Sequence, residues 1–171
     1  MPERIAMTET LKSIVRYIIA SALLFLPLPA SAQAGSYTAN VRGLPMHCTS
    51  YYGEPVLIVS NPELNNVGVA HRIVNGQPVI QLNPNVTHQF SALVAQWWFL
   101  HECAHHALAP QMNSETNADC FSIRQLRDLG LLVHPAQIQE FYYQLRNLPG
   151  SSSGHLPGPM RVEHMRQCLA Y

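Results

Sequence analysis

The spacing of hydrophobic and polar residues predicts a group of short strands in the first half of the chain. Apolar runs of strand length, some alternating with polar residues, fall at 37–41, 55–59, 67–74 and 77–82. The last two flank Asn75-Gly76, the dipeptide that most strongly favours a tight hairpin turn. The pattern therefore predicts a small antiparallel sheet.

Residues 90–108 begin the helical half of the chain. They are apolar on nearly every side, which is typical of a buried helix. Ser114 is a natural N-cap for a second helix that ends near Gly130. The intervening segment 109–113 has the length that joins two antiparallel helices. Strands followed by helices predict an α+β fold.

Two more helices are expected towards the C-terminus. His134-Pro135 begins one that continues to Leu148, because Pro is favoured at the first helical position. The Pro-, Gly- and Ser-rich segment 149–158 is expected to be a flexible linker before a short helix at 160–169.

The first 32 residues resemble a secretory signal peptide. Three basic residues precede the apolar run 17–28, which is too short to span a membrane and leads to a small-residue cleavage motif. Cleavage is expected after Ala32, with Ala34 as the second choice. This predicts a periplasmic or secreted protein with no stable membrane anchor after signal removal.

Cleavage would leave a single domain, 33–148, with the linker and C-terminal helix of 149–171 packed on it. This part of the chain has seven Arg, no Lys and eight acidic residues, a net charge of −1. A nucleic-acid partner would require a basic surface, so this class of partner is excluded.

All four cysteines lie in the exported part, and an even number in an oxidising compartment predicts two disulfides. The four allow three connectivities. The preferred interpretation pairs Cys103 with Cys120 across the two central helices, which leaves Cys48 to pair with Cys168.

His101-Glu102-Cys103-Ala104-His105 is the segment that points to chemistry. Two histidines four residues apart lie on one face of a helix, so both rings can bind one tetrahedral metal ion. Glu102 would then be close enough to polarise a water at that ion. Burial of these polar groups in an apolar helix costs several kcal/mol unless a metal compensates. The alternative is a core helix with hydrogen-bonded histidines.

The antiparallel helix pair would bring Glu115 beside His105 as a third ligand, with the fourth position left open. Asp119, one turn later, is expected to accept a hydrogen bond from a ligand imidazole. Two alternatives stay open at this point: Glu115 could stabilise the helix dipole, and Asp119 could form a salt bridge with an Arg.

HECAH followed by ETNAD resembles the gluzincin zinc metallopeptidases, especially small ones akin to the HtpX and CAAX-prenyl peptidases. The resemblance implies one Zn²⁺, with His101, His105 and Glu115 as ligands, Glu102 as the general base and Asp119 in support. It also implies a zincin-like fold and a peptide or protein substrate held against a sheet edge. Two departures are the short spacing of nine residues between His105 and Glu115 and the lack of following membrane-spanning helices.

The predicted function is an exported zinc metallo-endopeptidase. Members of this family also donate a hydrogen bond to the transition state from a distal side chain, and the candidates here are His134, Tyr142, Tyr143, His155 and His164.

Three further expectations accompany this prediction. His106 is expected to support the site or the helix surface. The C-terminal helix could also cover the cleft, with Glu163 or His164 near the metal. The alternative functions are a non-catalytic zinc-stabilised interaction module and a zinc amidase acting on cell-wall peptide.

Overall fold

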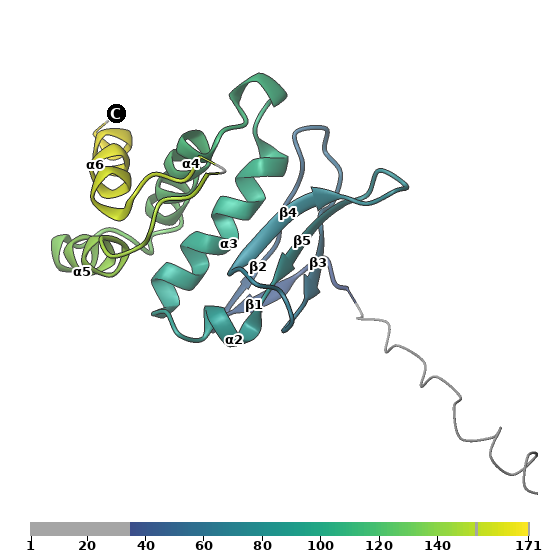
Figure 1. The fold of residues 1–171 in the computed structure, drawn as a ribbon, viewed down its shortest axis with the longest axis horizontal. Coiled ribbons are helices and arrows are strands. Elements are labelled where there is room, and N and C mark those ends of the chain that lie inside the picture. Colours follow the sequence, from purple (N-terminus) through teal and green to yellow (C-terminus); the bar gives the residue numbers. More distant parts are fainter. Residues whose placement is uncertain (1–34, 153, 171) are drawn as a thin grey trace, which may run out of the picture. The chain divides into compact units, whose positions relative to one another are not determined.

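The computed structural model describes residues 35–152 and 154–170, so the predicted signal peptide and its cleavage site lie outside the described residues. Within them the fold is α+β, as predicted, with two small sheets followed by helices (Figure 1). No helix in these ranges is long and apolar enough to cross a membrane.

The larger sheet has three strands in the order β3-β5-β4, where β3 is Leu57–Ser60, β4 is Gly68–Arg72 and β5 is Pro78–Leu82. The predicted hairpin is confirmed, because β4 and β5 are antiparallel and joined through Asn75-Gly76. The expectation of an antiparallel sheet is wrong in one part, because β3 pairs with β5 in parallel. β3 lies next to β5 and not next to β4, so β4 is an edge strand of this sheet.

The smaller sheet is the antiparallel pair β1 (Ala39–Val41) and β2 (Leu44–Met46). The short helix α2 (Pro84–Thr87), which was not expected, follows β5 and is capped by the side chain of Asn83. It precedes the central helix α3 (Ala92–Ala107).

The remaining helices agree with the predicted pattern, with bounds that differ by a few residues. A 3₁₀ turn (Pro110–Met112) connects α3 to α4 (Glu115–Asp128), and Ser114 caps α4 by accepting a hydrogen bond from the backbone N–H of Asn117. The last two helices are α5 (Pro135–Leu145) and α6 (Gly158–Leu169).

α3 lies between the sheet and the layer formed by α4, α5 and α6 (Figure 1). This position explains why its sequence is apolar on every side, since both faces are covered. Trp97 and Phe99 are fully buried, and the ring of Trp97 packs edge-on against Phe141 of α5, with 5.8 Å between centroids. Core residues from the neighbouring elements are Ile58, Ile80, Ile123, Leu126 and Leu145.

The two predicted disulfides are present, but the preferred pairing is wrong: Cys48 pairs with Cys103, and Cys120 pairs with Cys168. The reason is the orientation of α3. Its His101 face meets α4, so Cys103 on the opposite side cannot reach α4 and instead contacts the segment after β2. Cys120 faces α6.

We expect simultaneous replacement of Cys48 and Cys103 by Ala to lower the free energy of unfolding by about 2–5 kcal/mol. The lost cross-link joins residues 55 positions apart and so constrains a long loop of the unfolded chain. Urea denaturation measures the change. A peptide map under non-reducing conditions provides the check on connectivity, and a fragment linking Cys103 to Cys120 would contradict it.

Candidate metal centre

His101 and His105 lie one turn apart on the face of α3 that meets α4. Their Nε2 atoms are 3.3 Å apart. The ring of His101 is fully buried, whereas the side chain of His105 is 19% exposed and borders a cleft. Two imidazole nitrogens this close do not satisfy one another unless a proton or a cation lies between them.

Glu115 is in the first turn of α4, directly after its N-cap. Its Oε2 lies 3.0 Å from Nε2 of His101 and 3.6 Å from Nε2 of His105. Ligands held at zinc–nitrogen and zinc–oxygen bond lengths in a tetrahedron are roughly 3.3 Å apart. The three donor atoms therefore have the spacing of a preformed His₂Glu site, and the residues fit the metal that the sequence implied.

The outward nitrogen of each ring faces an oxygen atom. Nδ1 of His105 lies 2.8 Å from Oδ1 of Asn113, and Nδ1 of His101 lies 2.9 Å from Oδ1 of Asp119. We therefore assign the ring proton to Nδ1 in both, which leaves the two Nε2 lone pairs directed at a common point. Asp119 lies where the sequence placed it. Asn113 was missed, although it directly precedes the N-cap of α4.

Asp119 also forms the salt bridge that was the alternative prediction. Arg161 of α6 donates two hydrogen bonds of 2.7 Å to its carboxylate, and both residues are 1% exposed. The guanidinium of Arg161 lies 4.7 Å and 4.9 Å from the rings of Trp97 and Trp98. Sequence reasoning did not single out Arg161, because the helix that carries it is 42 residues away from Asp119.

Burial and the neighbouring cationic or hydrogen-bonding groups have opposite effects on the pKa values of Asp119 and Glu115. Burial opposes ionisation of Asp119, but His101 and Arg161 hold its pKa below the ordinary value. Burial also opposes ionisation of Glu115, yet the imidazoles of His101, His105 and His155 around its carboxylate lower its pKa strongly. Both carboxylates are therefore ionised near neutral pH: Asp119 is paired with Arg161, and Glu115 is available to a cation at the two imidazoles.

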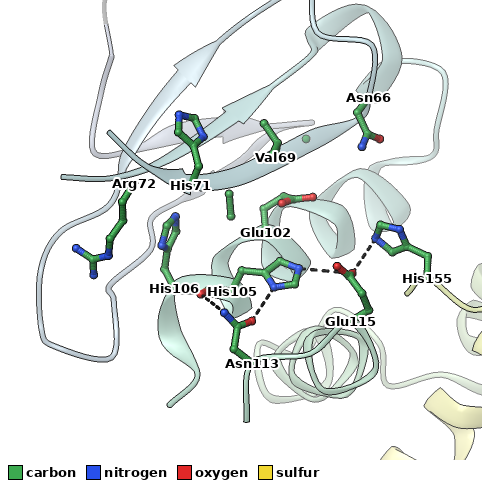
Figure 2. A pocket seen from close by; sticks show the side chains of 12 residues that line it. Asn66, Val69, His71, Arg72, Glu102, His105, His106, Asn113, Glu115 and His155 are labelled. Atoms are coloured by element: carbon green, nitrogen blue, oxygen red, sulfur yellow. Dashed lines mark hydrogen bonds and ion pairs between the residues drawn. The ribbon is translucent and has the colours of Figure 1, made fainter. Parts of the chain in front are cut away.

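Glu102 lies between the ligands and β4, as Figure 2 shows. It is 6% exposed, and burial raises its pKa above the ordinary value for Glu. β4 approaches it closely at Gly68, where a Cβ atom would come within 2.9 Å of Cγ of Glu102. This glycine allows the strand to form one wall of the site.

His155 reaches the site from the loop between α5 and α6 (Figure 2). Its Nε2 lies 2.8 Å from Oε2 of Glu115, and its Nδ1 lies 2.7 Å from the hydroxyl of Ser151. The segment expected to be a linker thus forms a second wall. Gly154 lies against Glu115, with a positive φ of 108° that disfavours other residues.

The other distal candidates lie elsewhere. His134 precedes α5 at its N-cap, Tyr142 is buried in the core, and the ring of Tyr143 packs on the guanidinium of Arg146. His164 lies beside Cys120, away from the cluster of His101, His105 and Glu115, so the structure does not place it over the cleft.

His106 is buried, and its Nε2 lies 3.0 Å from the carbonyl oxygen of Val79, so it connects α3 to β5. A cleft of about 480 Å³ runs between β4 and the ligands. Its lining residues are Asn66, Gly68, Val69, Ala70, His71, Arg72, Glu102, His105, His106, Asn113, Glu115 and His155.

No family model, no curated protein and no solved structure matches this chain.

We expect Arg161→Leu to lower the free energy of unfolding by about 3–5 kcal/mol, because the buried Asp119 carboxylate would lose its cationic partner. Arg166→Leu is the matched control on the same helix, since its side chain is 59% exposed. That variant should change the free energy by less than about 1 kcal/mol. Urea titrations with zinc and with chelator give both values, and equal effects of the two changes would contradict the prediction.

Proposed function

We propose that the protein is a zinc-dependent endopeptidase with a zincin-like arrangement of its catalytic elements. The observation that carries the proposal is the convergence of three donor atoms from His101, His105 and Glu115 at tetrahedral spacing, beside a cleft that contains Glu102. A structural zinc site usually closes its fourth position with a protein ligand, whereas a catalytic site leaves it open.

A bound Zn²⁺ would polarise the scissile carbonyl and make a water acidic enough to lose its proton near neutral pH. Glu102 accepts that proton and later donates it to the leaving amine. Its raised pKa suits this double role, because the carboxylate of a more acidic group would be too weak a base to take the proton from the water.

His155 donates a hydrogen bond to the oxygen that gains negative charge in the transition state. Ser151 supports this role, since its hydroxyl contacts Nδ1 and leaves Nε2 directed into the site. Nε2 lies 2.8 Å from Oε2 of Glu115, so the ring is already placed at the candidate ligands. A preorganised donor of this kind contributes mainly to the chemical step.

The substrate binds in extended form along the edge strand β4, in the cleft between β4 and the ligands. Residues Gly68–Arg72 offer backbone groups along one side of it. Gly68 brings this edge close to Glu102, so a peptide paired with β4 would have its backbone near the general base. The two disulfides fit an oxidising, exported location.

The first test compares Glu102→Gln with Glu115→Ala in the purified mature protein. Glu102→Gln should retain stoichiometric zinc and lower the turnover of a fluorogenic peptide library by about 10²–10⁴-fold. Glu115→Ala should lose zinc and melt at a lower temperature, because metal binding is coupled to folding.

Glu140→Gln, an acid exposed on α5, is the control and should change neither property. Loss of zinc from Glu102→Gln together with its retention in Glu115→Ala would reverse the assigned roles. A zinc-loaded wild type that cleaves no peptide would favour the non-catalytic zinc-stabilised module.

A second test concerns His155. His155→Phe should lower kcat by about 10²–10³-fold, the usual cost of a lost oxyanion donor. Zinc content and KM should change little. His88→Phe, on an exposed residue outside the cleft, is the control. An increase in KM alone, or loss of zinc, would show that His155 binds substrate or metal instead.

A further inference from the structure

A second group of metal-binding side chains lies between α4 and α6, and it shares no residue with the His101 site. It consists of Cys120 on α4 with His164 and Cys168 on α6, which we call the sulfur–imidazole cluster. Nε2 of His164 lies 3.2 Å from Sγ of Cys120, and Cys120 is bonded to Cys168. One donor atom from each residue lies within 4.8 Å of the others.

The spacing within α6 favours joint binding of a cation by this cluster. His164 and Cys168 are four residues apart and so share one face of the helix, as His101 and His105 do on α3. Cys120 faces them from α4. Cys120 and His164 are partly exposed, which leaves a path to solvent, and only Cys168 is buried.

The other disulfide offers a built-in comparison. Cys48 and Cys103 are both buried, and among residues 35–152 and 154–170 they belong to no such group of three possible ligands. The imidazole beside Cys120 is therefore a specific feature of one disulfide.

We propose that Cys120, His164 and Cys168 form a second metal site, for a soft d¹⁰ cation such as Cu⁺ or Zn²⁺, when the Cys120–Cys168 disulfide is reduced. Two thiolates and one imidazole are the ligands that such cations prefer. The site goes beyond the proposed peptidase activity and does not depend on it.

Conversion between the two forms requires a dithiol reductant. The reductant supplies two electrons and two protons, the bond between the two sulfur atoms breaks, and the reductant becomes a disulfide. The cation then displaces both thiol protons into solvent. Nε2 of His164, which donates to the carbonyl oxygen of Thr116 3.1 Å away, gives up this contact; its proton moves to Nδ1 through solvent, and the Nε2 lone pair binds the cation.

The experiment uses the mature chain, reduced with dithiothreitol and freed of it under anaerobic conditions. Cd²⁺ is the probe, because thiolate ligands produce a charge-transfer absorption that the His101 site does not. The double variant Cys48→Ala/Cys103→Ala keeps the cluster, and Cys120→Ala/Cys168→Ala keeps only the other pair. The reduced Cys48→Ala/Cys103→Ala variant should bind one equivalent of Cd²⁺ and show the charge-transfer absorption. The reduced Cys120→Ala/Cys168→Ala variant should not show it.

His164→Ala, introduced into the Cys48→Ala/Cys103→Ala background, should weaken Cd²⁺ binding by about tenfold or more through loss of a ligand. The oxidised wild type should show no absorption. Equal binding by the two double variants, no binding by the first, or no effect of His164→Ala would each overturn the proposal.

If reduction unfolds the first double variant, Cd²⁺ should restore its far-ultraviolet circular dichroism with one equivalent. At the same Cd²⁺ concentration, less of the circular dichroism signal should return in the variant that also carries His164→Ala. Failure to restore the folded signal would also overturn the proposal.

Discussion

The carboxylate of Asp119 is the point at which three helices are joined around a buried charge. It is 1% exposed, and a buried carboxylate costs several kcal/mol unless it is paired. α6 supplies Arg161 in a two-bond contact, α3 supplies His101, and α4 carries the carboxylate itself. The orientation of the His101 ring thus depends on how α6 packs, although α6 contributes none of the three candidate metal ligands.

Because of this dependence, residues 154–170 contribute to the structure of the site and do not only cover it. The loop before α6 brings His155 to Glu115, and the helix itself brings Arg161 to Asp119. Arg161 lies more than forty positions after the candidate ligands in the sequence. His155 is separated from them by the whole of α5. In this arrangement the C-terminal segment builds the site, and its removal should dismantle the site rather than uncover it.

Local patterns were enough to predict the parts of the site that lie close together in sequence. The spacing of His101 and His105 and the capping of α4 by Ser114 placed three donor atoms and Asp119 correctly relative to one another. Contacts between residues far apart in the sequence could not be predicted from such local patterns. Arg161 is one of seven arginines after residue 32, and the disulfide pairing depends on which face of α3 meets α4. The parallel pairing of β3 with β5 likewise depends on the path of the chain between these strands, which no turn motif in the sequence predicts.

Two glycines set the width of the site from opposite sides. Gly68 on β4 lies against Cγ of Glu102, and Gly154 in the loop before α6 lies against Cγ of Glu115, where a Cβ atom would be 3.3 Å away. A side chain at Gly68 would push the edge strand away from the proposed base. At Gly154, the positive φ would add backbone strain to the close contact. The two walls are therefore held at their present distance by close approach of the backbone, and this distance keeps Glu102 and His155 at the same cleft.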